Sequence, residues 1–321
     1  MEMNVEKKIV VIGSINIDYV CQTASLPRLG ETVLGGNFLT AHGGKGANQA
    51  VAAAKLAPAG TRVYFVGRVG DDATGGQLTT GLRQHDVCTE YISVCPQISS
   101  GVAMILVNQS GENCIAVSSG ANAKLTPADI DAAADLIRSA TCVVLQLEIP
   151  IATVAHAVRL CRRLGVYTIL DAGPVPADGL PAAVYDVDLF TPNETEAEML
   201  LDRRTVQAEP AEPEAVARSF LARGAKTVVL KQGSRGATAV TSSGEVFHCD
   251  ACRVNVVDTT AAGDAFTGAL AVARAEGMAL QDMVEFANRA GALCCTIAGA
   301  QPSLPTRQAV DGFCKTKKPA V

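Results

Sequence analysis

Charged residues are scarce in this sequence, and neither sign dominates. They make up 18% of the 321 residues, and the formal net charge of −5 leaves no basic surface for nucleic acid or an acidic membrane. No run approaches the roughly 18 apolar residues of a membrane span, and the N-terminus carries no signal-peptide pattern. We therefore expect a cytoplasmic protein that binds neither nucleic acid nor membrane and holds any anionic ligand with local groups.

Several familiar site motifs are also missing. The turn at residues 13–15 lacks the GxGxxG pattern of dinucleotide-binding folds, which argues against an NAD-binding dehydrogenase. The glycine-rich segment 41–50 lacks the Gly-Lys-Ser/Thr spacing of a Walker A loop. Eleven cysteines are scattered through apolar runs, and the one CxxC, at Cys249 and Cys252, has no second pair. This favours small core residues over a zinc or redox site.

The pattern that is present alternates short apolar runs with longer amphipathic stretches. Hydrophobic residues form 48% of the chain, enough to bury a large core. Strands are expected at 9–12, 63–66, 143–147, 167–170, 187–190, 227–230 and 237–240. Helices are expected at 45–56, 75–84, 127–139, 151–164, 195–201, 214–223, 262–275, 280–297 and 307–314. This order predicts an α/β fold: a three-layer sandwich whose mainly parallel central sheet is covered by helices on both faces.

Two regions break this rhythm, residues 16–40 and 97–118. Both alternate polar and apolar segments with no helix between them, and residues 110–113, Ser-Gly-Glu-Asn, form a turn between two such segments. They are typical of antiparallel strands and predict a small β-sheet lid that projects from the main sheet. We expect a single domain over residues 1–321, with the lid strands contributed by these two regions.

The segment 258–264, Asp-Thr-Thr-Ala-Ala-Gly-Asp, opens a strongly helical run. Small residues at a helix start leave backbone N–H groups free, and the helix dipole adds positive charge. Ala261, Ala262 and Gly263 therefore predict an anion hole for a transferring phosphoryl group. Such a transfer also needs one group that accepts the proton of the acceptor hydroxyl. Asp264 is placed to be this general base, although an aspartate near a helix N-cap is also common without a catalytic role.

A second segment, 43–49 (Gly-Gly-Lys-Gly-Ala-Asn-Gln), opens an alanine-rich helix. Its glycines let a ligand approach the backbone closely, while Lys45 and Asn48 offer donors to hydroxyl groups. Taken alone, the segment is equally typical of a plain glycine-rich helix entry.

Together these segments resemble the ribokinase-like (pfkB-type) carbohydrate kinases along essentially the whole chain. The matching segments occur in the family's order: 13–18 (GSINID), 43–49 (GGKGANQ), 191–196 (TPNETE), 258–264 (DTTAAGD) and 299–303 (GAQPS). Within the family, the ribokinase branch is the best match. The resemblance implies ATP-dependent, Mg²⁺-dependent phosphorylation of D-ribose at O5, which gives ribose 5-phosphate and ADP.

The resemblance also assigns a sugar site. Asn16 and Asp18 suit a vicinal diol, because together they supply donors and acceptors. Glu148 follows an apolar strand at the carboxyl edge of the sheet, where α/β folds bind ligands. The full set implied for the sugar is Asn16, Asp18, Gly44, Lys45, Gly46, Asn48, Glu148 and Asp264.

The nucleotide site is implied in the same way. Asn193 and Glu196 match the family's Asn-x-x-Glu element beside the phosphates and Mg²⁺, and one carboxylate acting through water is enough for an ion that keeps most of its waters. The segment 231–236 resembles the loop along the ATP, and Asn288 falls where the family contacts adenine. The full set is Asn193, Glu196, Lys231, Gln232, Gly233, Ser234, Arg235, Gly236, Gly263 and Asn288.

Two further properties follow from the resemblance. An activating K⁺ ion is implied beside the anion hole, where it would order the loop, held mostly by backbone carbonyl oxygens. Its residues are Asp258, Thr260, Cys294, Ile297, Gly299 and Ser303. A homodimer is implied as well, because pairing of the lids would cover strand edges that a monomer leaves exposed.

Two positions depart from the family's pattern. His42 stands where proline is common, and residues 171–174, Asp-Ala-Gly-Pro, replace a common Asn-Pro-Ala-Pro. We interpret His42 as a loop residue and assign neither position a chemical role. Two alternatives stay open: a sister kinase for deoxyribose, a nucleoside or another sugar, and a non-catalytic sugar or nucleotide sensor on the same fold. The complete Asp264 segment argues against the sensor.

Overall fold

The structure is a computed structural model that describes residues 6–202 and 212–315. Its main sheet has nine strands in the spatial order β13 (Val246–Cys249), β12 (Ala237–Thr241), β11 (Thr227–Lys231), β10 (Leu189–Thr191), β9 (Tyr167–Asp171), β8 (Cys142–Leu145), β1 (Lys7–Ile12), β4 (Thr61–Gly70) and β5 (Val87–Cys95). Every neighbouring pair from β11 to β5 is parallel, and β12 and β13 add an antiparallel edge.

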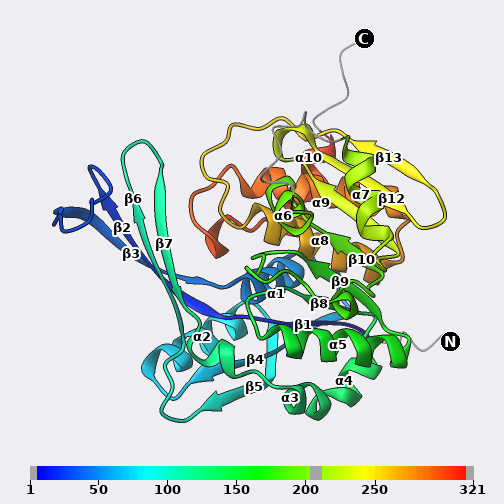
Figure 1. The fold of residues 1–321 in the computed structure, drawn as a ribbon, viewed down its shortest axis with the longest axis horizontal. Helices are drawn as coiled ribbons and strands as arrows, with labels where there is room; N and C mark the ends of the chain where they lie inside the picture. The colour runs from blue at the N-terminus through cyan, green and yellow to red at the C-terminus, as the bar shows by residue number, and fades with distance from the viewer. Residues whose placement is uncertain (1–5, 203–211, 316–321) are drawn as a thin grey trace.

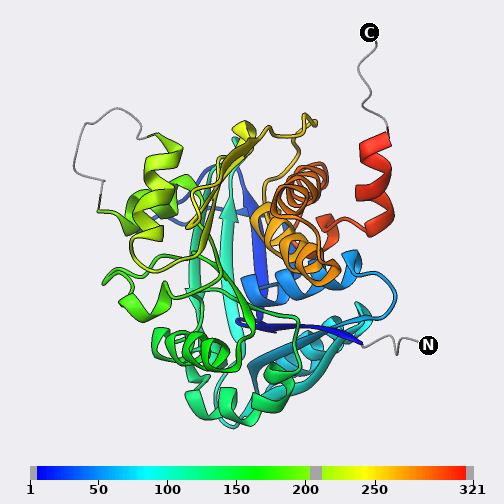
Figure 2. The same ribbon diagram turned by 90° about the vertical axis from the view of Figure 1, so that its right-hand side faces the viewer.

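Helices cover both faces of this sheet (Figures 1 and 2). One face carries α1 (Lys45–Leu56), α2 (Ala73–Gln84), α8 (Ala262–Glu276), α9 (Leu280–Cys294) and α10 (Arg307–Lys315). The other carries α3 (Pro127–Ala132), α4 (Ala134–Arg138), α5 (Ile151–Leu164), α6 (Glu194–Leu200) and α7 (Pro213–Leu221). The predicted three-layer α/β fold is confirmed.

The sequence of β1 explains why this strand lies between two hydrophobic cores, one on each face of the sheet. Ile9 and Val11 pack into the core under α1 and α8, while Val10 and Ile12 pack into the core under α5. All four side chains are fully buried. Successive side chains of a strand point to opposite faces, so a strand covered on both sides must be apolar throughout.

A second, smaller sheet projects from the body (Figure 1). Its order is β3 (Gly35–Gly43), β2 (Asn16–Thr23), β6 (Gly101–Val107) and β7 (Asn113–Ser118). The outer pairs are antiparallel, as predicted, but β2 and β6 pair in parallel. We call these four strands the small sheet. Its strand β3 ends at Gly43 and leads directly into α1, so the small sheet is joined to the body beside the glycine-rich segment.

Some predicted boundaries were wrong. The helix expected over 127–139 is two helices, because the backbone leaves helical geometry at Ala133, with φ −93° and ψ 7°. The strand expected over 143–147 ends at Leu145, so Glu148 lies in the following loop. The edge strand β5 was missed, since its apolar residues are interrupted by Thr89, Glu90 and Ser93. Within the described residues, no helix is long and apolar enough to cross a bilayer.

Candidate active site

The site lies where the strand order reverses. From β1 the chain continues to β4 and β5 on one side, and later to β8, β9, β10 and β11 on the other. Such a switch point opens a crevice at the carboxyl ends of the strands, where open α/β sheets bind ligands. Ser14 follows β1 and donates through Oγ to Oε2 of Glu148, which follows β8, at 2.5 Å. The backbone N–H of Lys45 donates to the same oxygen at 2.9 Å, so Glu148 joins both strands to the start of α1.

Asp264 lies in the first turn of α8 and is only 6% exposed. Its Oδ2 accepts a hydrogen bond from Asn48 Nδ2 and its Oδ1 accepts one from Gln49 Nε2, both at 3.0 Å. Both donors are on α1, which packs against α8. The predicted base and the predicted sugar ligand Asn48 are therefore in direct contact.

The charge state of Asp264 is set by opposing effects. Burial raises its pKa, the Lys45 ammonium lowers it, the Asp171 carboxylate raises it, and the hydrogen bonds from Asn48 and Gln49 lower it; the result is a pKa of about 6. A carboxylate with a pKa just below neutral is ionised at pH 7 and remains basic enough to take a proton in a transition state.

Asn16 is the first residue of β2, and its side chain is held by Asn122. Asn122 Nδ2 donates to Asn16 Oδ1 at 2.7 Å, and Asn122 also bonds both the N–H and the carbonyl of Ile15. A Cβ on Gly101 would lie 2.1 Å from Asn16 Oδ1, so only glycine fits there. No role was assigned to Asn122 from the sequence, because it is one polar residue in a segment with no regular pattern.

Asp18, two residues further along β2, faces the same crevice. A Cβ on Gly43 would lie between 2.0 and 2.5 Å from its carboxyl atoms, so the glycine makes room for the acid. Burial raises the pKa of Asp18 to about 7, with further contributions from Glu148 and Asp264. Three carboxyl groups assigned to the sugar or the base thus influence one another.

The start of α8 is a tight turn. Ala261, its N-cap residue, has φ 59° and ψ 8°, a left-handed conformation that costs a residue with a side chain about 1–2 kcal/mol. The N–H of Ala262 donates to the carbonyl of Thr259 at 3.2 Å. A Cβ on Gly263 would lie 3.7 Å from Lys231 Nζ. The segment predicted as an anion hole therefore lies beside a lysine ammonium group.

Asn193 and Glu196 cap α6 reciprocally. The N–H of Glu196 donates to Asn193 Oδ1, and the N–H of Asn193 donates to Glu196 Oε2, each at 2.8 Å. The second oxygen, Oε1, faces the crevice: a Cβ on Gly173 would lie 2.4 Å from it and 2.9 Å from Lys45 Nζ. One carboxylate oxygen beside the lysine remains for a ligand or a hydrated ion.

The other residues predicted for the nucleotide surround the carboxyl ends of β11 and β13. The loop 232–236 contains a short 3₁₀ turn, and Arg235 within it pairs with Glu194 at the start of α6. Asn288, on α9, donates to the carbonyl of Cys249 at 3.2 Å. The amide of Asn288 therefore already has one backbone partner at the end of β13.

The residues predicted for K⁺ form one network. Asp258 Oδ1 accepts from the N–H and the hydroxyl of Thr260 at 2.9 and 2.6 Å, and Oδ2 accepts from the N–H of Gly299 at 2.8 Å. Cys294 Sγ lies 3.5 Å from the carbonyl of Thr260 and 3.0 Å from Ser303 Oγ. Burial raises the pKa of Asp258, but the hydrogen bonds outweigh it, so the net shift is downward.

Ile297 joins this network through its backbone, because its N–H donates to the carbonyl of Cys294 at 3.4 Å. Its side chain is exposed and offers no ligand atom. Among the residues that the structure describes, no group of three His, Cys, Asp or Glu residues could hold a metal ion. The oxygen atoms of the network include the backbone carbonyls of Thr260 and Cys294 and the hydroxyls of Thr260 and Ser303, and oxygens of this kind are ligands for a hard cation.

Asp171, in the segment 171–174 that received no chemical role from the sequence, contacts residues that did receive one. Asp171 ends β9, is 0% exposed, and accepts from Lys231 Nζ at 2.6 Å and from Gln49 Nε2 at 2.8 Å. Gln49 in turn accepts from Gln146 Nε2 at 2.6 Å. A signal was available, because Asp171, like Glu148, comes at the carboxyl end of an apolar strand.

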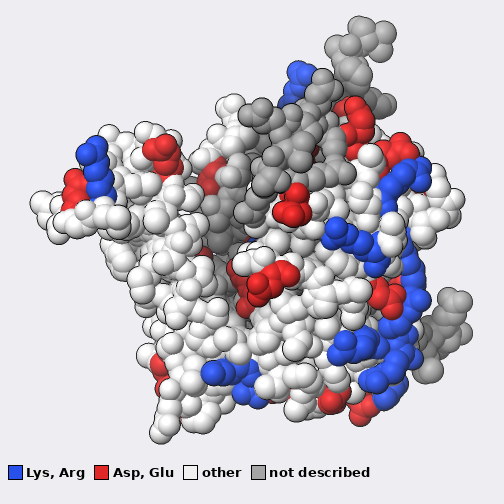
Figure 3. Space-filling view, viewed as in Figure 1, with Lys and Arg blue, Asp and Glu red and all other residues white. Residues whose placement is uncertain are grey.

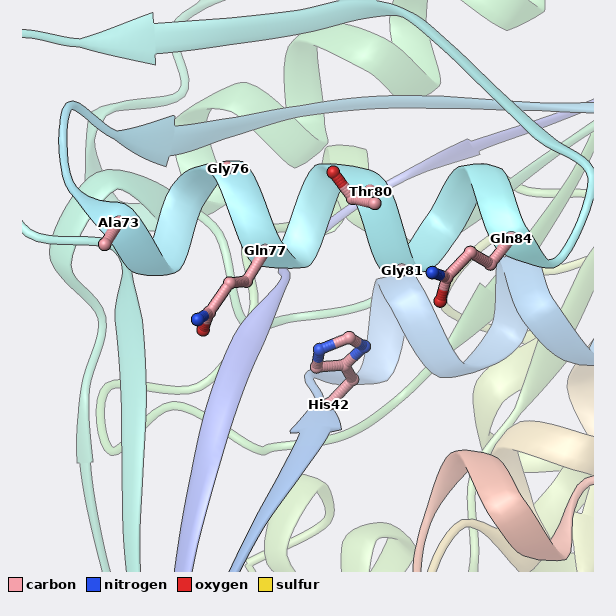
Figure 4. Close-up of a pocket in the computed structure, with 7 residues that line it drawn as sticks. All are labelled: His42, Ala73, Gly76, Gln77, Thr80, Gly81 and Gln84. Carbon is pink, nitrogen blue, oxygen red and sulfur yellow. The ribbon is translucent and has the colours of Figure 1, made fainter.

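His42 is a strand residue rather than a loop residue, since it lies in β3. Its ring points toward α2 (Figure 4), and a Cβ on Gly81 would lie 2.3 Å from the imidazole. Burial lowers the pKa of His42. The ring borders a surface pocket of about 550 Å³ lined by His42, Ala73, Gly76, Gln77, Thr80, Gly81 and Gln84. His42 therefore belongs to the contact between the small sheet and α2.

Charge is distributed unevenly over the face seen in Figure 1. Acidic side chains gather near its middle, while Lys and Arg follow its right-hand edge (Figure 3). With a net charge of −5, the protein has no broad positive field, so any anionic ligand would have to be held by local donors.

Comparison with known proteins agrees with this geometry. The family model described as pfkB family carbohydrate kinase matches residues 6–307. A ribokinase of Schizosaccharomyces pombe is 39% identical over 97% of this chain and 98% of that relative. A deoxyribokinase of Salmonella typhi is 37% identical over 93% of this chain and 95% of that relative. The solved structure of an Arabidopsis thaliana ribokinase complexed with ribose and ATP has a TM-score of 0.86 and 32% identity, and the match covers 97% of this chain and 99% of that one.

Proposed function

The chain belongs to the pfkB family of carbohydrate kinases, and on this basis we propose that it transfers the γ-phosphoryl group of ATP to O5 of D-ribose. The observation that carries the proposal is Asp264, a buried carboxylate with a pKa of about 6 that contacts Asn48 on one side and opens α8 on the other. A base between a sugar-binding helix and an anion-binding helix start suits phosphoryl transfer to a hydroxyl.

In this proposal the sugar lies against the start of α1 and the base of the small sheet. Asn16, Asp18, Lys45, Asn48 and Glu148 bind the ring hydroxyls, and Gly44 and Gly46 let the sugar approach the backbone. Asp264 accepts the proton of the 5-hydroxyl while O5 forms its bond to the γ-phosphorus. The bond from that phosphorus to the bridging oxygen breaks, and its electron pair leaves with ADP. The products are ribose 5-phosphate and ADP.

Backbone N–H groups of Ala261, Ala262 and Gly263 stabilise the charge of the transferring group. Because the N–H of Ala262 donates to Thr259 in this structure, it must be shared with or released to the phosphate. Residues 231–236 and Asn288 flank the nucleotide. Glu196, with Asn193, would hold the hydrated Mg²⁺ that accompanies ATP, and this ion would offset phosphate charge. The free Oε1 of Glu196 fits that task.

A K⁺ ion fits the network of Asp258, Thr260, Cys294, Ile297, Gly299 and Ser303. The side chain of Asp258 already joins the Thr260 backbone to Gly299, so an ion held there stiffens the turn that precedes α8. Activation is then structural, because the hydrogen bonds of Asp258 fix the loop before α8, whereas the carboxylate of Asp264 accepts from Asn48 and Gln49. Cys294 contributes through its carbonyl, because a thiol is a poor ligand for a hard ion.

We further propose a cytoplasmic homodimer paired through the small sheet. Phe38 is 62% exposed, Met104 is 60% exposed, and Ile115 and Val117 are more than half exposed. These residues lie on β3, β6 and β7, and apolar strands with free edges favour association. Light scattering of the purified protein is expected to give twice the 33.2 kDa chain mass; a monomer at working concentration contradicts the dimer.

An acceptor panel tests the function. The purified protein is given D-ribose, 2-deoxyribose, other pentoses, hexoses and nucleosides with Mg·ATP, with and without K⁺, and ADP release is measured. D-ribose is expected to have the highest kcat/KM and to be phosphorylated faster with K⁺. A different leading acceptor overturns the choice of sugar, and absence of ADP release with every acceptor overturns the kinase assignment in favour of a sensor.

The deoxyribokinase relative supports one second candidate, 2-deoxyribose, which lacks one hydroxyl of a vicinal diol. If Asp18 binds both hydroxyls of that diol, Asp18→Asn lowers kcat/KM for ribose more than for deoxyribose, because ribose presents two hydroxyls to Asp18 and deoxyribose only one. Discrimination between two sugars is large when one of them leaves a buried polar group of the site without a hydrogen-bond partner. Equal losses for both sugars place Asp18 elsewhere on the ring.

A further inference from the structure

Asp171 carries a buried charge that the proposed reaction does not use. Its side chain is 0% exposed at the carboxyl end of β9. Oδ1 accepts from Lys231 Nζ at 2.6 Å, and Oδ2 accepts from Gln49 Nε2 at 2.8 Å and lies 3.8 Å from Lys45 Nζ. A fully buried carboxylate is stable only with such partners, and each of them belongs to a different part of the site.

Lys45 begins α1 and belongs to the sugar side. Gln49 lies one helical turn further on, and its Nε2 donates to Asp171 and also to Asp264, at 2.8 and 3.0 Å. Its Oε1 accepts from the buried Gln146, which fixes the direction of the amide. One carboxylate therefore contacts a sugar-side lysine and, through a single amide group, the base.

Lys231 ends β11 and opens the nucleotide loop. Its side chain is 12% exposed, and Asp171 is the one hydrogen-bond partner of its ammonium group among the described residues. An ammonium carries three N–H donors, so donors remain for a ligand. The same Nζ lies 3.7 Å from the Cβ position of Gly263, directly beside the start of α8.

We propose that Asp171 is a positioning residue for phosphoryl transfer: it holds the Lys231 ammonium beside the start of α8, where it reaches the transferring phosphate, and through Gln49 it orients Asp264. The inference rests on the proposed phosphoryl transfer. Lys231 supplies positive charge to the transition state, and Asp171 keeps that charge at one place when no phosphate is present.

A second consequence concerns the base. The groups that face Asp264 are Lys45, Asn48 and Gln49 from α1, Asp171 from β9, Asp18 from β2 and the Cys294 thiol from α9. Of these, Lys45 lowers the pKa of Asp264 and Asp171 raises it. Without the Asp171 charge, Lys45 acts unopposed by that carboxylate and the pKa of Asp264 falls. Lys231 is not among the largest influences on the pKa of Asp264, so removing its charge should move that pKa less than removing the Asp171 charge does.

The experiment compares Asp171→Asn, Lys231→Met and the double variant with the wild-type protein, by steady-state kinetics in ATP and in ribose across pH. Asp171→Asn keeps the side-chain shape and removes the charge. It is expected to lower kcat by about 10- to 100-fold, in keeping with loss of alignment at a reacting centre. KM for ATP rises, and the acid limb of the pH–rate profile moves to lower pH. Lys231→Met raises KM for ATP and lowers kcat to a similar extent, and it moves the acid limb less than Asp171→Asn does.

If Asp171 acts through Lys231, the double variant loses much less than the product of the two single losses, because the two residues share one interaction. Lys231→Arg, which keeps a cation, is expected to restore part of the activity lost in Lys231→Met. A loss in the double variant equal to the product of the two single losses overturns the inference. So does an Asp171→Asn protein whose kcat, KM for ATP and acid limb match those of the wild type. Should Asp171→Asn not fold, an unchanged KM for ATP in Lys231→Met overturns it alone. Loss of all activity in the wild-type panel, by contrast, refutes the kinase function itself.

Discussion

Asp258 and Asp264 lie six positions apart in one segment, yet the fold treats them in opposite ways. Asp264 is buried against α1 and accepts from the side chains of Asn48 and Gln49. Asp258 is half-buried in the preceding loop and accepts mainly from nearby backbone N–H groups and one hydroxyl. The first carboxylate is surrounded by other charges, and the second is used to fix a turn.

The pKa directions follow from these surroundings. Burial and the neighbouring Asp171 carboxylate raise the pKa of Asp264 against the effect of Lys45, whereas three hydrogen bonds lower the pKa of Asp258 despite burial. Two identical side chains thus acquire the properties of a base and of a structural anchor. The comparison teaches that position relative to α1, rather than the motif itself, distinguishes their roles.

Asp264→Asn is expected to have the largest effect. Removing the base should lower kcat by about 10²- to 10⁴-fold, the usual contribution of general-base catalysis. ATP binding, measured by calorimetry, should stay close to wild type, because Asp264 faces the sugar and the reacting oxygen. Asp258→Asn is the matched control, with a much smaller loss of kcat. Near-normal turnover of purified Asp264→Asn protein with ribose contradicts the base assignment.

The same substitution should stabilise the protein above pH 6. The folded-state pKa of Asp264, about 6, exceeds its ordinary 3.8, so the folded state binds more protons between these values and stability falls as pH rises through them. Two units correspond to about 3 kcal/mol at most. Urea unfolding of wild type and Asp264→Asn is expected to diverge between pH 4 and 7, with the variant more stable. Parallel stability curves refute the raised pKa.

Activity should show the matching pH dependence. Because Asp264 must be ionised to accept a proton, kcat/KM for ribose is expected to rise between pH 5 and 7, with an apparent pKa of about 6. Asp18, with a pKa of about 7, interacts with Asp264, so the two groups titrate as a pair. Asp18→Asn should leave one simpler acid limb at lower pH. A profile flat from pH 5 to 8 contradicts this.

The fold could be predicted because its signals are local, and the predictions for the candidate site rest on local signals as well. The apolar runs of β1 and β9 and the glycine-rich entry to α1 follow from neighbouring residues. The strand end marks Asp171 as a residue near the site, but its contacts could not be predicted, because they involve Lys231, sixty positions away, and Gln49. The parallel pairing of β2 with β6 was missed for the same reason: strand pairing between distant segments leaves no pattern in either of them.

Asp258→Asn is expected to give an intermediate effect. The amide keeps one acceptor oxygen, so bonds to Thr260 or to Gly299 are lost, at about 1–2 kcal/mol of unfolding free energy. The lowered pKa of Asp258 means that its stabilisation is present above its ordinary pKa and is lost as pH falls through the folded value, the opposite sign to Asp264. The response of kcat to K⁺ should disappear. A variant still activated by K⁺ places the ion elsewhere.

Ala261→Gly should have the smallest effect. It tests whether the backbone strain at Ala261, in the turn between Asp258 and Asp264, matters for kcat. Glycine adopts the φ of 59° at this position without the side-chain clash, which relieves about 1–2 kcal/mol, but the unfolded chain gains entropy worth about 0.4–1 kcal/mol. The net change in unfolding free energy is therefore a small stabilisation, of about 1 kcal/mol or less, measurable by urea denaturation. If kcat stays near wild type, the turn acts through its shape alone. A large loss of kcat in a stabilised protein instead shows that the methyl group limits the turn to the conformation that presents its N–H groups to the phosphate.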